Sequence, residues 1–315
     1  MRILLTNDDG IRALGIVALY DALMDTHKGF GSPLLDPRDG TPCEVLVVAP
    51  ETVQSATSHG VTFHEPLMIR EVEVNERMRG ISVAGRPADC CKLALTALWP
   101  ERFGAGSRPD LVISGMNAGA NVGINVIYSG TVAAAIEAAF LGVPSIAVSL
   151  HLGMGMPLFD AAAGHARRAI EAILRTKYPL DAHECLNVNI PRTELPGEQG
   201  MRERDSRIRP APESLRPLDP RVDPRAMLPI RVCPMNTHGL NDRYERRESP
   251  SGDVYYWAAG HGMDFHNTEP GSDVDLLFER HITVTPLGYD LTRHADLAAW
   301  QGVAVGRERE GEKER

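Results

Sequence analysis

The first ten residues constrain the fold of this chain more than any other stretch. Residues 3–5 form a short apolar run, which ends abruptly at the polar turn Asn-Asp-Asp-Gly of residues 7–10. An apolar run followed by a polar turn with glycine is typical of a strand that is buried on both faces of a parallel sheet. Similar runs recur at residues 44–50, 111–113 and 144–150, with helix-like segments between them. The sequence therefore predicts a doubly wound α/β fold with a mostly parallel sheet.

The composition changes along the chain and indicates four regions. Residues 1–191 are expected to form the α/β domain, and residues 192–230 a loop rich in proline and arginine. Residues 231–300 contain strand-like segments, joined by a long polar turn around 236–252, and are interpreted as a smaller β-rich extension with a C-terminal helix region. Residues 301–315 alternate in charge and are expected to be a frayed tail. Strand edges in such an extension suit contacts between subunits.

Composition disfavours several classes of partner. The net charge of −9 argues against a nucleic-acid polymer, which needs a positive surface. The chain has no apolar run long enough to cross a bilayer, so no membrane contact is expected, and the N-terminus lacks the layout of a secretory signal. The five cysteines are odd in number and lack CxxC spacing, so neither a disulfide framework nor a zinc site is indicated. A cytoplasmic location is expected.

Two adjacent carboxylates, Asp8 and Asp9, stand where the first predicted strand ends. In an open α/β sheet, ligands bind in the crevice beyond the carboxyl ends of the strands. Neighbouring carboxylates repel each other unless a positive charge lies beside them, and a hard divalent cation such as Mg²⁺ takes oxygen ligands of this kind. The alternative is an ordinary turn, in which the Asn and Asp side chains satisfy backbone groups and glycine takes a positive φ.

Other polar groups are expected at the same edge of the sheet. Ser55 lies in the hydroxyl-rich turn after the second strand, and Asn117 lies in the glycine-interleaved stretch after the third. Residues 129–131, Ser-Gly-Thr, begin an alanine-rich helix whose N-terminus suits a phosphate, although a simple Ser/Thr cap is the alternative. A metal bound by these oxygens could polarise a phosphoryl group and lower the pKa of a bound water for in-line attack on a phosphate ester.

Five ordered blocks stand out along the chain: NDDG at 7–10, AP…QSATS at 49–58, SGMNAGANVG at 114–123, YSGTVAAAIEA at 128–138 and GVPSIAVS at 142–149. With these blocks, the chain resembles the SurE family of metal-dependent 5′/3′-nucleotidases. The resemblance covers residues 1 to about 150, with a weaker similarity around residues 232–294.

The resemblance implies a Rossmann-like domain and a metal-dependent phosphomonoesterase that hydrolyses nucleoside 5′- or 3′-monophosphates. It implies one divalent ion (Mg²⁺, Mn²⁺ or Ca²⁺) and assembly as a homodimer or homotetramer. The implied metal ligands are Asp8, Asp9, Ser55 and Asn117. Of these, Asp8 and Asp9 are also predicted to be catalytic. The predicted substrate- or phosphate-binding residues are Asn7, Asn121, Ser129, Gly130 and Thr131.

Two other interpretations compete with this one, and one further residue is a candidate for catalysis. A non-catalytic metal- or nucleotide-binding module of the receiver type needs a later phosphoacceptor Asp and a Lys, but Ser55 and Asn117 follow the corresponding strands here. A phosphatase with an aspartyl-phosphate intermediate usually spaces its aspartates as DxD, whereas Asp8 and Asp9 are adjacent. His59, just after the Ser55 turn, is a candidate for protonating the leaving oxygen, with a plain surface histidine as the alternative.

Overall fold

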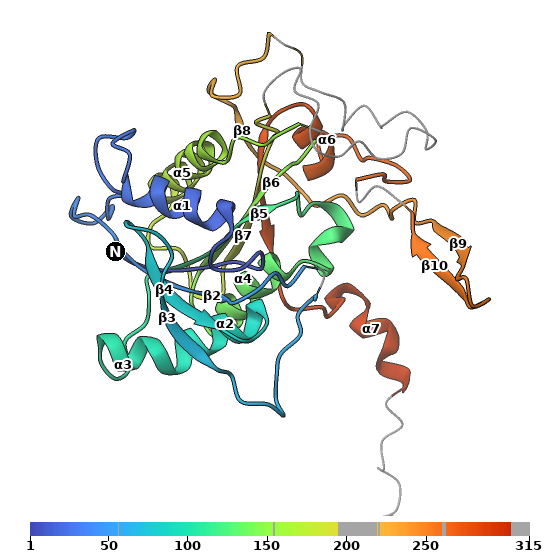
Figure 1. Ribbon diagram of the computed structural model, residues 1–315, viewed down its shortest axis with the longest axis horizontal. Helices are drawn as coiled ribbons and strands as arrows, with labels where there is room; N and C mark the ends of the chain where they lie inside the picture. The colour runs from blue at the N-terminus through green and yellow to red at the C-terminus, as the bar shows by residue number, and fades with distance from the viewer. Residues whose placement is uncertain (56, 154, 195–218, 220, 260–262, 304–315) are drawn as a thin grey trace, which may run out of the picture.

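The computed structural model describes residues 1–55, 57–153, 155–194, 219, 221–259 and 263–303. Its centre is a nine-stranded sheet in the order β3-β4-β2-β1-β5-β6-β7-β11-β8, with helices on both faces (Figure 1). The elements of the first half are β1 (Arg2–Thr6), α1 (Leu14–Met24), β2 (Glu44–Pro50), β3 (Ile69–Glu73), β4 (Arg79–Val83), α2 (Pro87–Leu93), η1 (Ala94–Leu98), α3 (Trp99–Phe103), β5 (Leu111–Ala118) and η2 (Gly123–Ile127). Those of the second half are α4 (Gly130–Phe140), β6 (Ser145–Leu150), α5 (Phe159–Thr176), β7 (Cys185–Ile190), β8 (Ile230–Val232), β9 (Tyr244–Glu248), β10 (Val254–Ala258), α6 (Asp273–Phe278), β11 (Ile282–Leu287), η4 (His294–Asp296), α7 (Leu297–Trp300) and η5 (Gln301–Val303).

Six central strands, β4-β2-β1-β5-β6-β7, run parallel to one another. Successive side chains of β1 point to opposite faces, as the two-residue period of a strand requires. Ile3 and Leu5 pack into a core with α1 and α5, whereas Leu4 packs into a second core with α2 and α4. Because both faces are covered, the strand reads as a continuous apolar run. The predicted doubly wound, mostly parallel α/β class is confirmed.

Strand β5 extends further than the sequence predicted, so Gly115 has a structural role within the strand. The stretch Ser-Gly-Met-Asn was expected to be a loop whose backbone approaches a ligand, but it belongs to β5, and the register with β6 shifts between Ser114 and Asn117. Gly115 has φ +139°, and a Cβ there would lie 2.2 Å from the carbonyl oxygen of Val148. The glycine is needed where two strands meet at an irregular register, which apolar patterning does not reveal.

The strands of residues 231–300 divide between two sheets. β11 and β8 join the edge of the large sheet, where β11 pairs antiparallel with β7 and parallel with β8. Only β9 and β10 form a separate antiparallel pair, which projects from the body of the molecule (Figure 1). β9 falls inside the stretch expected to be a polar turn, because all five of its residues are exposed and it has no apolar face to signal a strand. The predicted loop at 192–230 and tail at 301–315 lie largely outside the described residues.

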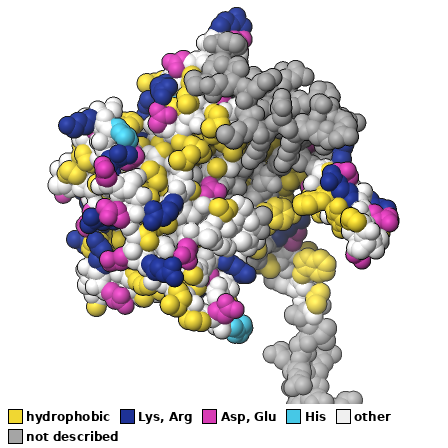
Figure 2. Space-filling model, in the orientation of Figure 1, with side chains coloured by type: hydrophobic (Ala, Val, Ile, Leu, Met, Phe, Trp, Pro, Cys, Tyr) yellow, Lys and Arg dark blue, Asp and Glu magenta, His cyan; other side chains and the backbone are white. Residues whose placement is uncertain are grey.

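No helix in the described part of the chain combines the length and the apolar character that a bilayer span requires. On the face shown in Figure 2, the Lys and Arg side chains of the described residues are interspersed with Asp and Glu side chains.

Candidate active site

The turn that follows β1 is braced from within. Asn7 is fully buried, and its Nδ2 donates a hydrogen bond of 2.8 Å to the carbonyl oxygen of Gly10. Gly10 has φ +97°, which a side chain would oppose. The backbone N–H of Gln54 donates to the carbonyl oxygen of Asp8 at 2.7 Å, so the turn after β2 is joined to the turn after β1. Asn7 thus shapes the turn, and its predicted contact with phosphate stays a prediction.

Asp8 is the most buried acid of the predicted site, with 4% of its surface exposed. Its Oδ1 accepts a hydrogen bond from the hydroxyl of Thr131 at the start of α4. Burial raises the pKa of Asp8 to about 6; the Thr131 hydrogen bond opposes this rise and the neighbouring Asp9 carboxylate adds to it. The hydrogen bonds to Asp8 therefore do not fully compensate the cost of burying its ionised carboxylate.

Asp9 and Asn117 meet at the end of β5. The backbone N–H of Ala118 donates to Asp9 Oδ2 at 2.8 Å, which places Asp9 beside Asn117. Burial also raises the pKa of Asp9, and the Ala118 hydrogen bond partly opposes that rise. Asn117 Nδ2 donates to the carbonyl oxygen of Gly119 at 2.7 Å, and within the described residues no donor reaches its Oδ1. The amide oxygen that a metal would need is thus left available.

Ser55 follows Gln54 directly. The hydrogen bond from Gln54 to Asp8 therefore brings the serine close to the turn after β1. Ser55 is exposed, and its hydroxyl has no hydrogen-bond partner among the residues that the structure describes. Three hydrogen bonds therefore join the turn after β1, which carries Asp8 and Asp9, to the turn of Ser55, to the end of β5 beside Asn117 and to the start of α4. This convergence at the carboxyl ends of β1, β2 and β5 is what the parallel-strand argument predicted.

Helix α4 begins against Asp8. A Cβ on Gly130 would lie 2.9 Å from Asp8 Cβ and 3.0 Å from Pro87 Cγ, so glycine alone lets the helix start this close. Ser129 is the N-cap, and its Oγ accepts a hydrogen bond of 3.1 Å from the N–H of Val132. The remaining N–H groups of the first turn and the positive end of the helix dipole suit a phosphate.

The cap can be tested separately from phosphate binding. We expect Ser129→Ala to lower the free energy of unfolding by about 1 kcal/mol, because the N–H of Val132 loses its acceptor. Urea unfolding of both proteins measures this difference. Ser129→Asp keeps an acceptor at the N-cap and should restore most of the stability. If Ser129→Ala were as stable as the parent, the hydrogen bond from Val132 would not contribute to stability and the cap assignment would be contradicted.

Asn121 belongs to a buried polar network that sequence reasoning missed. Its Nδ2 donates to Ser149 Oγ at 2.8 Å, and its backbone N–H donates to Asn189 Oδ1 at 2.8 Å. Its carbonyl oxygen accepts from Asn187 Nδ2 at 2.7 Å and from Asn189 Nδ2 at 3.0 Å. The sequence did hold one indication of this network: Asn187 and Asn189 are two residues apart and so lie on the same face of β7. The network fixes the segment after β5 across β6 and β7, and the predicted contact of Asn121 with phosphate stays a prediction.

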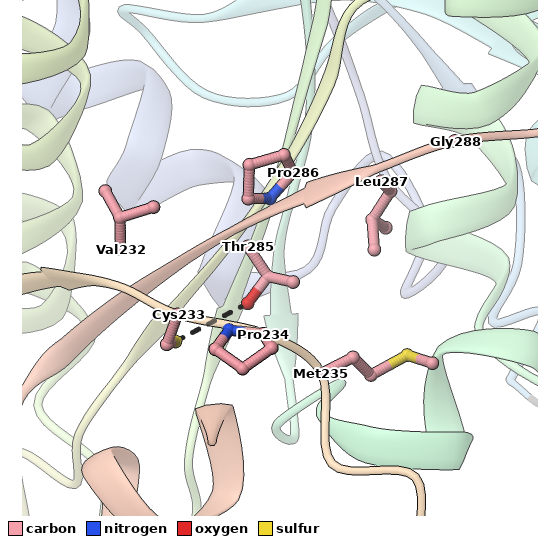
Figure 3. Close-up of a pocket in the computed structure, with 8 residues that line it drawn as sticks. All are labelled: Val232, Cys233, Pro234, Met235, Thr285, Pro286, Leu287 and Gly288. Atoms are coloured by element: carbon pink, nitrogen blue, oxygen red, sulfur yellow. Dashed lines mark hydrogen bonds between the residues drawn. The ribbon is translucent and has the colours of Figure 1, made fainter. Parts of the chain in front are cut away.

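A pocket of about 620 Å³ lies elsewhere, between residues 232–235 and 285–288 (Figure 3). In it, Cys233 Sγ and Thr285 Oγ1 are 3.7 Å apart. Its lining supplies no carboxylate and no cationic side chain. None of the predicted site residues lines this pocket, so it is separate from the candidate active site at the ends of β1, β2 and β5.

A comparison with protein-family models decides the family. The model described as Survival protein SurE matches residues 3–207, which is more than half of the chain. The chain belongs to the SurE family.

Curated SurE relatives match along nearly the whole chain. A protein of Solidesulfovibrio magneticus named 5′-nucleotidase SurE is 38% identical over 312 residues, covering 97% of this chain and 97% of the relative. Another of that name, from Syntrophobacter fumaroxidans, is 37% identical over 294 residues, covering 93% and 96%. The crystal structure of the SurE protein from Aquifex aeolicus superposes with a TM-score of 0.68 at 28% identity, covering 96% of this chain and 99% of that one. The resemblance drawn from the five blocks is confirmed.

Sequence reasoning also missed an acidic residue of this SurE chain that lies next to the Ser55 turn. Glu137, in α4, has 4% of its surface exposed and lies 2.8 Å from His59 Nε2 and 3.0 Å from Lys92 Nζ. Burial alone raises the pKa of Glu137, but hydrogen bonds from His59 and Lys92 outweigh it and hold the pKa below its usual range. The available signal was the single charge in an otherwise uncharged helix sequence.

Proposed function

We propose that this chain is a metal-dependent 5′-nucleotidase that hydrolyses nucleoside 5′-monophosphates, with 3′-monophosphates as a second substrate class. The observation that carries the proposal is the pair Asp8 and Asp9, two poorly exposed adjacent carboxylates against the N-terminus of α4. In the described part of the chain, no Lys, Arg or His forms an ion pair with either of them. The names of the curated relatives support the same reaction.

The residues present fit a hard divalent cation. The proposed ligands are the carboxylates of Asp8 and Asp9, the hydroxyl of Ser55 and the amide oxygen of Asn117, all oxygen donors that suit Mg²⁺, Mn²⁺ or Ca²⁺. No group of three or more His, Cys, Asp or Glu side chains is placed to hold a metal among the described residues, which is consistent with a set that has only two acids. A bound cation would also compensate the charge that burial opposes in Asp8.

Each part of the site has a separate task in this proposal. When bound, the cation polarises the phosphoryl oxygen and lowers the pKa of water. The hydrogen bond from Thr131 fixes the orientation of Asp8, and the first turn of α4 offers N–H groups to the phosphate. Asn117 lies near the end of β5 and Ser55 lies in the turn after β2, and both are proposed to complete the set of oxygen ligands.

Phosphate release from a panel of nucleoside monophosphates tests the proposal. We expect no release from AMP, GMP or 3′-AMP in EDTA, and release that returns when excess Mg²⁺ or Mn²⁺ is added. Circular dichroism before and after EDTA shows that the protein stays folded. Activity that EDTA does not reduce would contradict the metal requirement. A folded protein that binds Mn²⁺ but releases no phosphate with any metal would favour a binding module.

We further propose a cytoplasmic homodimer or homotetramer. All five cysteines are free and buried, which suits a reducing compartment. The β9–β10 pair exposes Tyr244, Tyr256 and Trp257, with 71%, 61% and 59% of their surfaces accessible. Exposed aromatic side chains on a projecting strand pair are suited to a subunit contact. Light scattering during size-exclusion chromatography measures the mass of the assembly.

A further inference from the structure

The segment that carries Ser55, residues 54–62, contains no helix or strand among its described residues, so its position depends on individual contacts. At its start, Gln54 N–H donates to the carbonyl oxygen of Asp8. Further along, Ser58 N–H and Oγ donate to the carbonyl oxygens of Tyr128 and Ile127, at 3.2 and 2.9 Å. At its end, Thr62 N–H and Oγ1 donate to the carboxylate of the buried Asp89, each at 2.7 Å.

Among the described residues, His59 makes the only side-chain hydrogen bond or ion pair between this segment and the body of α4. Its Nε2 lies 2.8 Å from Glu137 Oε2, and the other carboxylate oxygen of Glu137 accepts from Lys92 of α2 at 3.0 Å. His59 is part-exposed, with 38% of its side chain accessible, whereas the Glu137 side chain is 5% accessible. The exposed loop is thus tied to a buried anchor.

A requirement for stability does not explain this anchor well. A carboxylate buried in a helix of small residues has a large desolvation cost, and such buried ion pairs are often no more stable than apolar replacements. Alanine, the commonest residue of α4, also has the higher helix propensity. Glu137 is therefore better explained by the geometry that it fixes than by the stability that it adds.

Helix α4 contacts the proposed metal site and the segment that carries Ser55 at two points along its length. Thr131 in the first turn of α4 holds Asp8, and Glu137, six residues further along the same helix, holds His59. Because a helix is stiff over this length, it sets Asp8 and the Ser55 segment at a fixed separation. We propose that Glu137 and His59 are positioning residues that place the Ser55 hydroxyl against Asp8 for metal binding.

This inference rests on the proposed function, and it assigns His59 a different task from proton donation. Because Nε2 faces Glu137, a histidine that acts as the general acid would have to present its other ring nitrogen, Nδ1, to the leaving oxygen. The two assignments predict different defects. Loss of positioning weakens metal binding and is overcome by excess metal, whereas loss of a general acid lowers kcat at any metal concentration.

The test compares Mn²⁺ binding by variants of the full chain, using the electron paramagnetic resonance signal of free Mn²⁺. We expect His59→Ala and Glu137→Ala each to raise the Mn²⁺ dissociation constant about tenfold, as loss of an outer partner of a metal site does. The double variant should be no worse than either single one, because both remove one interaction. Glu137→Gln keeps a hydrogen-bonding partner for His59 and should restore binding to within about twofold of the parent.

Lys92→Met is the matched control, since it removes the other partner of Glu137 but no contact of the Ser55 segment. It should leave the Mn²⁺ dissociation constant unchanged, even if it lowers the melting temperature. With saturating Mn²⁺, His59→Ala should recover the kcat and KM of the parent for AMP. Unchanged Mn²⁺ affinity in His59→Ala, or a low kcat that metal does not restore, would overturn the positioning role alone. A parent protein without Mn²⁺ binding would overturn the proposed function and this inference with it.

Discussion

Asp8→Asn is expected to reduce metal-dependent phosphate release from AMP by about 10³-fold or more. Asparagine keeps the shape of the side chain and an acceptor for the Thr131 hydroxyl, but it removes a charged ligand from the cation. A metal ion that stabilises developing charge contributes several kcal/mol to catalysis, and about 4 kcal/mol corresponds to a 10³-fold change in rate. The measurement is kcat/KM at several Mn²⁺ concentrations, because a lost ligand also weakens metal binding.

The same variant should be more stable than the parent when no metal is present. The pKa of Asp8 is raised from 3.8 to about 6, so the folded protein binds the Asp8 proton more tightly than the unfolded chain does. Ionised Asp8 therefore opposes folding. This cost is absent below pH 4, grows as the pH rises towards 6, and is fully present above it. From the size of the shift, Asp8→Asn should gain on the order of 2 kcal/mol at pH 8 in EDTA, and nothing at pH 3.5.

Urea unfolding in EDTA at the two pH values checks that sign, and added Mn²⁺ should reverse the order of stability at pH 8 because only the parent binds it well. Asp242→Asn serves as the control, since it removes one negative charge from an exposed side chain that forms no ion pair within the described residues. It should change neither activity nor stability appreciably. If Asp8→Asn were less stable than the parent at pH 8 without metal, burial would not be the dominant influence on Asp8.

Features encoded by neighbouring residues were predictable from the sequence. The apolar run of β1 and the turn after it lie in one short stretch of sequence. This pattern has few interpretations other than a buried parallel strand. Ser55 and Asn117 could be placed near Asp8 and Asp9 because parallel strands end at a common edge. The convergence of these turns in the structure shows that strand order was not needed for that part of the prediction.

Features that depend on contacts between distant residues could not be predicted in this way. His59 and Glu137 are separated by 78 positions, and no periodic pattern links a loop histidine to one face of a helix. The hydrogen bond from the Thr131 hydroxyl to Asp8 was not predicted either, because it depends on how closely α4 approaches β1. The predicted contact of Thr131 with phosphate stays a prediction. β9 was missed because both of its faces are exposed, so no alternation of apolar and polar residues marks it.

The close approach of α4 to β1 leads to the second large effect, at Gly130. We expect Gly130→Ala to lower kcat/KM for AMP about 100-fold, even though alanine favours helices. The added Cβ would lie 2.9 Å from Asp8 Cβ and 3.1 Å from Asp8 Oδ2, so either the carboxylate or the start of the helix must move. Displacing a catalytic group by up to about 1 Å can lower the rate by about 100-fold.

Gly164→Ala in α5 is the matched control, because the substitution is the same and lies within a helix. There the new Cβ would lie 3.7 Å from Phe30 Cζ, an ordinary van der Waals contact. This variant should keep full activity and gain about 0.5 to 1 kcal/mol in the free energy of unfolding, because alanine loses less backbone entropy than glycine. Gly130→Ala should instead lose stability through overpacking, by about 1 to 3 kcal/mol. Equal kcat/KM in Gly130→Ala and the parent would mean that the start of α4 can shift without displacing Asp8, and that the contact between them does not set the geometry of the site.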